Sequence, residues 1–296
     1  MLLITNFTSS PDDIADRPAV ILTARVHPGE SNSSYIIEGV IDYLISSDES
    51  AKQLRNRYVF KVVPMLNPDG VVVGNYRCSL AGNDLNRQWI FPSTKYNPEI
   101  SAVKQMIRKT LDSREISFYC DFHGHSRAKN AFMYGCQNSQ KEKRLKERIF
   151  PLLFSRRCIE FSFEESDFNV YKVKESTARV VLWKEYSLLN SFTLECSFCG
   201  PSAGPYKDSH FSIPMLLDLG RKFCQTLLEY SNLELAEDSQ KQTRKLLKEI
   251  DSMNQQSRTT PTNDKQANSL KGSLLVPAPL SDMDESVGKK HGHKST

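Results

Sequence analysis

The stretch Pro18-Ala-Val-Ile-Leu-Thr-Ala-Arg-Val-His-Pro-Gly-Glu30 decides the fold. Its apolar run, residues 18–26, predicts a strand that is buried on both sides, because strands covered by helices on both faces are apolar almost throughout. The run leads directly into His27 and Glu30. Open α/β sheets place their ligand sites at the carboxyl ends of the strands. The stretch therefore predicts a buried strand that delivers a histidine and a glutamate to a site.

Strand and helix patterns alternate along the rest of the chain. Segments rich in Val, Ile, Phe and Tyr predict further strands, and these lie at residues 58–66, 116–122, 131–135 and 191–196. Helices are predicted where apolar residues recur every three or four positions, at residues 32–47, 97–111, 141–153 and 213–230. This alternation predicts an α/β protein whose sheet is covered by helices on both faces.

Composition narrows the protein class. The 296 residues carry 39 basic and 35 acidic side chains, a net charge of +4, which is too balanced to predict nucleic-acid binding. The start of the chain lacks the features of a secretory signal, and no run of eighteen apolar residues predicts a membrane span. The seven cysteines are scattered rather than arranged as a disulfide framework. Free thiols in a reducing compartment are therefore expected.

Two later segments complete a metal-site pattern. These are Asp121-Phe-His-Gly-His-Ser126 and Asn190-Ser-Phe-Thr-Leu-Glu195. With His27 and Glu30 they supply two imidazoles, one carboxylate ligand and a separate carboxylate, as in a catalytic zinc site with one open position and a base. Each segment alone is weak evidence for a metal site, since a buried histidine after a strand is usually a core residue. Periodicity leaves His123 and His125 open as the third ligand, because residues two apart face the same side of a strand.

Three further motifs extend the pattern to a family. They are Asn67-Pro-Asp-Gly70, Asn75-Tyr-Arg-Cys78 and Asp84-Leu-Asn-Arg-Gln-Trp89. The order H-P-G-E, N-P-D-G, N-R, D-x-H, F-T-x-E resembles the zinc metallocarboxypeptidases related to carboxypeptidase A. One branch of this family, the cytosolic carboxypeptidases, is similar in amino-acid sequence to residues 25–34, 64–70, 123–126 and 174–180. The enzymes of this branch trim glutamates from protein C-termini, above all those of tubulin. The resemblance covers about residues 1–230 and implies an α/β/α fold with a mixed, mostly parallel sheet.

The resemblance implies a role for each motif residue. One zinc ion per chain is bound by His27, Glu30 and His123, since the count from Phe132-Met-Tyr-Gly135 fits His123. His125 then lines the substrate pocket. Glu195 is the general base and later the proton donor to the leaving amine. Independently of the resemblance, Asp121 or a backbone carbonyl is a candidate for orienting an imidazole.

The substrate-binding residues are also implied by the resemblance. Asn86 and Arg87 match the pair that binds the terminal carboxylate, and Arg77 lies where an arginine polarises the scissile carbonyl. Arg179 is the candidate cation that selects a glutamate side chain, with Lys172 and Lys174 as weaker candidates. The expected partners are acidic protein C-terminal tails, tubulin first, and neither nucleic acid nor membrane. The expected location is the cytoplasm, with association at microtubules, cilia or basal bodies.

The domain prediction divides the chain near residue 232. Residues 1–232 are predicted to be the catalytic domain and residues 233–296 a partly helical and then disordered polar tail; Leu246–Ile250 extends a helix and disorder begins at Asp251. Met1–Thr5 reads as a strand already within the sheet. Since this branch carries an N-terminal β-sandwich domain and starts its catalytic domain earlier, the fold is expected to be N-terminally truncated, with a sheet edge left uncovered.

Two other functions compete with a peptidase. A truncated relative without turnover would act as a module that binds tubulin tails. An amidohydrolase of the aspartoacylase type shares the fold and the zinc ligands. The Asn86-Arg87 pair, the segment Asn67–Gly70 and the position of Glu195 after Phe-Thr favour the peptidase.

Overall fold

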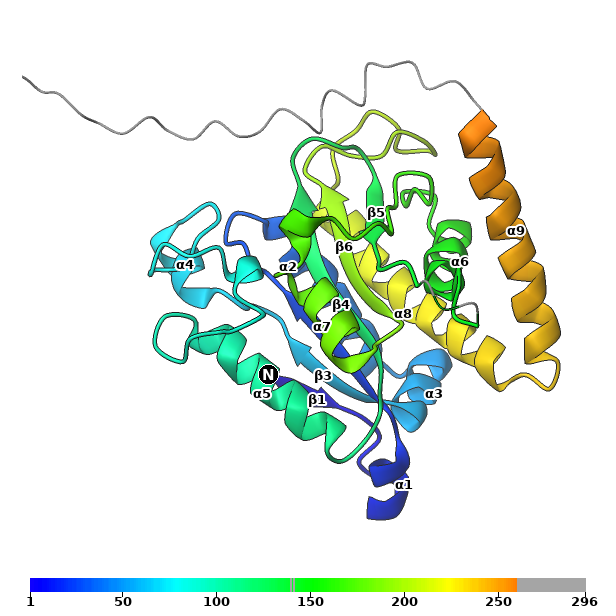
Figure 1. Cartoon of the computed structure of the whole chain (residues 1–296), viewed down its shortest axis with the longest axis horizontal. Helices are drawn as coiled ribbons and strands as arrows, with labels where there is room; N and C mark the ends of the chain where they lie inside the picture. Colours follow the sequence, from blue (N-terminus) through cyan, green and yellow to red (C-terminus); the bar gives the residue numbers. More distant parts are fainter. Residues whose placement is uncertain (139, 141, 260–296) are drawn as a thin grey trace, which may run out of the picture. The chain divides into compact units, whose positions relative to one another are not determined.

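The central strand is the apolar run that opens the metal-site motif. The computed structural model of the chain describes residues 1–138, 140 and 142–259 (Figure 1). Six strands form one sheet in the order β1-β3-β2-β4-β6-β5, and their bounds are β1 Leu2–Ile4, β2 Ala19–Ala24, β3 Val59–Val63, β4 Ile116–His125, β5 Ala131–Tyr134 and β6 Ser191–Ser197. The four inner strands are parallel, and β1 and β5 pair antiparallel at the two edges. The mixed, mostly parallel sheet is confirmed.

Helices cover both faces of this sheet, as the alternation predicts (Figure 1). The α-helices are α1 Pro11–Asp16, α2 Ser31–Ile45, α3 Glu49–Arg57, α4 Pro68–Val73, α5 Pro98–Leu111, α6 Ile149–Arg157, α7 Ala178–Tyr186, α8 Ile213–Leu235 and α9 Ser239–Thr259. Short 3₁₀ helices are η1 Leu85–Arg87, η2 Lys146–Arg148 and η3 Lys172–Lys174. On one face Leu22 of β2 packs with α2, α6 and α8, and on the other Ile21 packs with α5 and α7.

Helices α2 and α8 cross at backbone contact. A Cβ at Gly39 of α2 would overlap the carbonyl of Leu217, and one at Gly220 of α8 would overlap the carbonyl of Ile36. Only residues without a side chain allow this approach. Because α2 begins at the residue after Glu30, the crossing anchors the segment that follows the first metal-site motif.

Several element boundaries differ from the sequence prediction. Strand β4 continues three residues beyond residue 122, because its parallel pairing with β6 extends to His125. The helix predicted over 141–153 instead starts at Ile149 and runs to Arg157, after the 3₁₀ turn η2. The sequence patterns did not predict α1, α3, α4 and α7. They are short, and α7 has the consecutive buried residues Val180, Val181 and Leu182 rather than an amphipathic period.

The C-terminal region is more helical than predicted. Helix α9 continues through residues 251–259, where disorder was predicted, because Met253 extends the apolar face of Leu246 and Ile250. Residues 260–296 of the predicted tail lie outside the described residues. Helix α8 runs through the predicted boundary at residue 232, and the compact unit comprises Met1–Met253.

Strand β1 lies in the sheet, as Met1–Thr5 predicts, and forms one of its edges. Its residues Leu2 and Leu3 are 43% and 46% exposed. Among the helices of the described part of the chain, none offers the long apolar stretch that crossing a lipid bilayer requires.

Candidate metal centre and active site

The loop after β2 is held in a tight conformation by Arg25. This residue has a left-handed backbone, with φ at 57°, which is uncommon for a side-chain-bearing residue and clusters at functional sites. Its Nε donates to the carbonyl of Pro28 (2.7 Å) and its Nη1 to Ser34 Oγ (2.7 Å). The guanidinium therefore ties the middle of the loop that carries His27 and Glu30 to the first turn of α2.

A second loop supports the first through Gly29. The Gly29 amide donates to the carbonyl of Tyr76 (2.8 Å), and a Cβ at Gly29 would lie 2.7 Å from the Tyr76 ring. The glycine of the H-P-G-E motif is therefore required for the close approach of the two loops. Since Arg77 follows Tyr76, this contact also places the predicted carbonyl-polarising arginine beside the loop with the metal ligands.

Three predicted ligands meet at one point. One donor atom each of His27, Glu30 and His123 lies within 4.8 Å of the others, and all three residues are buried. His27 Nδ1 lies 2.6 Å from Glu30 Oε1, and His123 Nδ1 lies 2.9 Å from Glu30 Oε2. Two imidazoles and one carboxylate are the protein ligands of many catalytic zinc sites. The donor set therefore fits zinc.

The outer nitrogens of both imidazoles meet carboxylates. His27 Nε2 lies 3.1 Å from Asp84 Oδ1, and His123 Nε2 lies 2.7 Å from Asp121 Oδ2. Metal-binding histidines usually donate their other ring N–H to such a group, which fixes the tautomer. This arrangement leaves the Nδ1 atom of each ring for a metal. Asp121 was a candidate for this role, whereas Asp84 lies in a quoted motif but received no role from the sequence.

The charges around the three ligands favour a cation. Burial opposes ionisation of His123, yet Asp121 and Glu30 raise the pKa of His123 well above its ordinary value. Burial likewise opposes ionisation of Glu30, but His123 and His27 hold the pKa of Glu30 well below its ordinary value. The centre thus stabilises positive charge between its carboxylates, which a divalent cation supplies.

His125 lies outside this ligand group. Its Nδ1 accepts from the backbone amides of Ala128 (2.9 Å) and Arg127 (3.2 Å). Although both histidines belong to β4, the structure brings His123 and not His125 to Glu30. His125 is only half-buried and its ring contacts Phe132.

Glu195 is next to the ligand group through strand pairing. In the parallel register of β4 and β6, Glu195 is the direct partner of His123. Burial, with the charge of Glu30, raises the pKa of Glu195 to about 7, against the opposing effect of His123. A carboxylate beside the ligand group, rather than within it, can act as a base.

Asp84 also organises the predicted substrate-binding residues. Arg77 donates from Nε and Nη2 to Asp84 Oδ2, each at 2.8 Å, and the Arg77 side chain is 42% exposed. Arg87 Nη1 lies 4.0 Å from the same oxygen and donates to the carbonyl of Asn86 (3.0 Å). Asn86 is buried, and its Oδ1 accepts from the amide of Ala178 at the start of α7 (3.0 Å). The two guanidinium groups thus flank one carboxylate at the metal centre.

Arg179 is buried rather than exposed. Its Nη1 donates to the carbonyl of Gly135 and lies 3.5 Å from Cys136 Sγ. Its guanidinium lies 5.8 Å from the ring centroid of Tyr134. Burial and the charge of Glu195 raise the pKa of Tyr134, whereas Arg179 lowers it. The charges of both Arg179, the candidate specificity cation, and Glu195, the candidate base, therefore act on the pKa of Tyr134.

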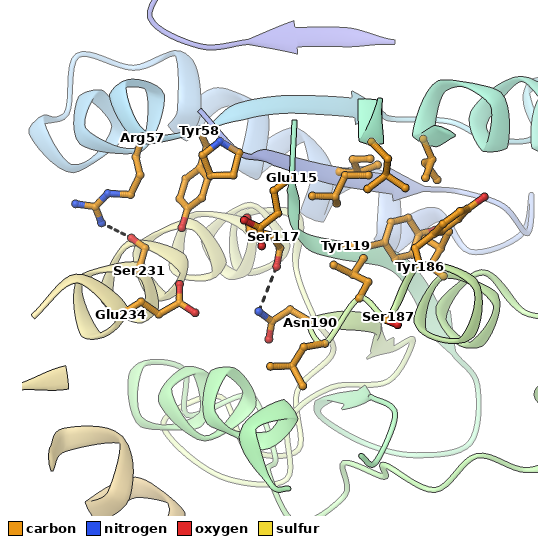
Figure 2. A pocket seen from close by; sticks show the side chains of 18 of the residues that line it. Arg57, Tyr58, Glu115, Ser117, Tyr119, Tyr186, Ser187, Asn190, Ser231 and Glu234 are labelled. Atoms are coloured by element: carbon orange, nitrogen blue, oxygen red, sulfur yellow. Dashed lines mark hydrogen bonds between the residues drawn. The ribbon is translucent and has the colours of Figure 1, made fainter. Parts of the chain in front are cut away.

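A cavity of about 480 Å³ lies at the amino ends of the inner strands (Figure 2). The lining includes residues at or just before the amino ends of β2, β3, β4 and β6, namely Pro18, Tyr58, Ile116 and Asn190, and Glu234 of α8. None of the predicted site residues belongs to this lining as far as the chain is described. The metal centre is at the carboxyl ends of the same strands, as the general rule for such sheets predicts.

Comparisons with known proteins agree with this geometry. The sequence profile of the zinc carboxypeptidase family matches residues 1–187. Cytosolic carboxypeptidase 2 of Mus musculus is 49% identical over 231 residues, which are 78% of this chain and 27% of that protein. Cytosolic carboxypeptidase 3 of Bos taurus is 49% identical over 240 residues, 80% of this chain and 23% of that protein. The chain thus spans about a quarter of the length of these relatives.

Solved structures show the same fold. A metallo-carboxypeptidase from Burkholderia cenocepacia superposes with a TM-score of 0.68 at 26% identity, covering 78% of this chain and 60% of that one. A metallo-carboxypeptidase from Pseudomonas aeruginosa superposes with a TM-score of 0.67 at 25% identity, covering 76% and 59%. With the sequence match over more than half of its length, the chain belongs to the zinc carboxypeptidase family.

Proposed function

We propose that this chain is a zinc-dependent carboxypeptidase that removes C-terminal glutamates from proteins such as polyglutamylated tubulin. The observation that carries the proposal is the pairing of Glu195 with His123 across β4 and β6, beside the ligand group of His27, Glu30 and His123. A base held next to three metal ligands is the minimum that hydrolysis by a zinc-activated water requires.

Each site residue has a chemical task in this proposal. Zinc held by His27, Glu30 and His123 would act as a Lewis acid and lower the pKa of water. Glu195 would accept a proton from the attacking water and later give it to the leaving amine. Arg77, which is partly exposed beside Asp84, donates to the carbonyl oxygen as negative charge develops there. Arg87 and Asn86 bind the terminal carboxylate, since a guanidinium can hold a carboxylate by two hydrogen bonds.

Cations around the site support an acidic substrate. Partial burial and the charge of Arg87 lower the pKa of Lys174, on which Arg77 and Arg179 also act. Four basic groups in one field would attract glutamate-rich C-terminal tails, which are the proposed partners. The names of the relatives, cytosolic carboxypeptidases, support a cytoplasmic location. Association with microtubules, cilia or basal bodies is part of the proposal and follows from the tubulin substrate.

The non-catalytic alternative has no observation in its favour. A tubulin-binding module without turnover would have no need of Glu195 beside the three candidate metal ligands, yet Glu195 pairs with His123, and Arg77 and Arg87 flank Asp84. Membership of the zinc carboxypeptidase family likewise favours a peptidase over an aspartoacylase-type amidohydrolase.

The test uses the purified, zinc-loaded chain and a peptide that ends in several glutamates. We expect mass spectrometry to show stepwise loss of glutamate residues, none from the same peptide with an amidated C-terminus, and none with Glu195→Gln. Equal processing of the free and amidated peptides would exclude a carboxypeptidase that requires a free terminal carboxylate. An intact free peptide after prolonged incubation with the zinc-loaded chain would favour the binding module.

A further inference from the structure

Lys104 of α5 has an environment that is unusual for a lysine. Its side chain is only 3% exposed, although lysine is almost never fully buried unless it is paired. Its ammonium group donates to the carbonyls of Trp89 (2.7 Å) and Ile90 (2.9 Å) and to Glu185 Oε1 (2.8 Å). All three N–H donors of the ammonium thus have a partner. The lysine joins three separate segments of the chain.

Two of these segments carry the candidate carboxylate-binding groups. Trp89 and Ile90 end the loop of residues 84–90, which contains Asn86 and Arg87. Glu185 lies in the last turn of α7, and Arg179 lies near the start of the same helix. At its other end α7 is joined to the same loop, because the Ala178 amide donates to Asn86 Oδ1 (3.0 Å). The loop and α7 are therefore connected near both ends of the helix.

At the Trp89 end of the loop, the remaining contacts are mostly apolar and non-directional, whereas Asp84 and Asn86 form directional bonds at the other end. Leu85 and Trp89 are fully buried among apolar residues, and such contacts are non-directional. The Trp89 indole N–H is buried with no partner among the described residues, so the indole adds no hydrogen bond. The Trp89 amide donates to the carbonyl of Ser176 at 3.3 Å. The two short bonds from Lys104 are therefore the main directional restraint at this end of the loop.

We propose that Lys104 is a positioning residue that fixes Arg87 relative to α7. It does so from behind the loop, without touching substrate. With the loop so fixed, the α-carboxylate of a terminal glutamate meets Arg87 while its side-chain carboxylate reaches the cation of α7. This inference rests on the proposed function and extends it. The distance between Arg87 and the cation of α7 would then depend on the buried ion pair of Lys104 and Glu185.

The test compares Lys104→Met with Lys61→Met. Lys61 is also partly buried and donates to Thr110 Oγ1 of α5 (2.7 Å), but it bonds to neither the loop nor α7 in the described structure. Both are made in the zinc-loaded Glu195→Gln protein, which holds peptide without cleaving it. Two quantities are measured: the Kd of a glutamate-terminated peptide against that of its C-terminal amide, and hydrogen exchange at the amides of residues 85–90.

We expect Lys104→Met to lose the preference for the free acid by about tenfold or more, because small misplacements of a positioning group are costly. Exchange at residues 85–90 should rise in the same variant. Lys61→Met should change neither. The double variant Lys104→Met/Glu185→Leu removes the carboxylate left without its lysine, and it should show the same loss of preference even if the single variant folds poorly.

Two results would overturn the inference, and they can be told apart. If Lys104→Met, or the double variant, keeps both the preference and the slow exchange, Lys104 has only a structural role. If the Glu195→Gln parent with Lys104 intact binds acid and amide equally, the proposed carboxypeptidase function fails and the inference fails with it.

Discussion

Asp84 lies 3.1 Å from the outer imidazole nitrogen of His27, and its second oxygen accepts two bonds from Arg77. One carboxylate thus connects a candidate metal ligand to a partly exposed arginine. His27 and Arg77 hold the pKa of Asp84 well below its ordinary value, against the opposing effect of burial. The carboxylate therefore stays ionised where it orients the imidazole and restrains the arginine.

Replacing Asp84 by Asn should weaken zinc binding without abolishing it. Outer partners of ligating histidines typically contribute a factor of about 10 to 100 in metal affinity. Competition with a chromophoric chelator measures the loss, and the exposed Asp69→Asn is the control. Equal affinity in Asp84→Asn and the parent would show that Asp84 does not orient His27.

Alanine at His27, Glu30 or His123 should each abolish stoichiometric zinc, because a catalytic site with only two protein ligands binds the metal poorly. His125→Ala should retain one zinc per chain, since its imidazole nitrogen accepts from the turn that follows β4. Metal analysis of the four purified variants decides the matter. Zinc kept by His123→Ala and lost by His125→Ala would reverse the assignment.

Glu195→Gln should keep zinc and peptide binding and lose turnover by a factor of about 10² to 10⁴, the usual contribution of a positioned base. Turnover of a glutamate-terminated peptide and its Kd are measured side by side. The exposed Glu38→Gln serves as the control. Near-parental turnover in Glu195→Gln would mean that another carboxylate is the base.

The core of this site follows from the sequence, because the segments that carry the candidate ligands lie at or just beyond the carboxyl ends of two strongly apolar strands. His27 and His123 are in motifs at the carboxyl ends of β2 and β4, and parallel strands bring such ends together. The residues that support the ligands were harder to predict. Asp84 acts across a long sequence gap, and Lys104 sits in an amphipathic helix where a lysine normally faces solvent.

The prediction that disorder begins at Asp251 is wrong for residues 251–259, for a related reason. Composition from that residue onward is polar, and polar segments lack the apolar surface needed to order themselves. A single apolar residue per turn is enough when the helix has already begun, however. Leu246 and Ile250 are buried in the main core, and the helix that they anchor continues through residues 251–259.

Arg179→Met should lower the preference for glutamate over leucine at the peptide C-terminus by about 10- to 100-fold, the value of a hydrogen bond to a charged group. Zinc content should be unchanged. Catalytic efficiency on peptides ending in Glu, Leu and Lys measures the preference. If Arg179→Met keeps the preference for glutamate over leucine, another cation selects the side chain. Lys172, Lys174 and Arg127 are then tested in turn.

Glu147 should make the protein less stable as the pH rises. It is fully buried and accepts from Asn138 Nδ2 (3.2 Å), and burial raises the pKa of Glu147 above its ordinary value of 4.5. The folded state then binds the proton more tightly than the unfolded chain. The free energy of unfolding therefore falls as pH rises from the unfolded pKa through the folded one.

Glu147→Gln removes this titration. We expect the Tm of Glu147→Gln minus that of the parent to be larger at pH 8 than at pH 5, with zinc present at both. The exposed Glu38→Gln should show no such trend. The same Tm difference at both pH values would contradict the proposed ionisation cost.

The pairing of His123 with Glu195 has a consequence for how this catalytic centre can change over evolution. Their separation is set by the spacing of two adjacent parallel strands, about 4.8 Å, and not by the length of a loop. A single-residue insertion in β4 or β6 would turn one of them to the other face of the sheet. Evolution would therefore retain His123, the candidate ligand, and Glu195, the candidate base, together. Changes in substrate specificity would have to arise in the surrounding loops.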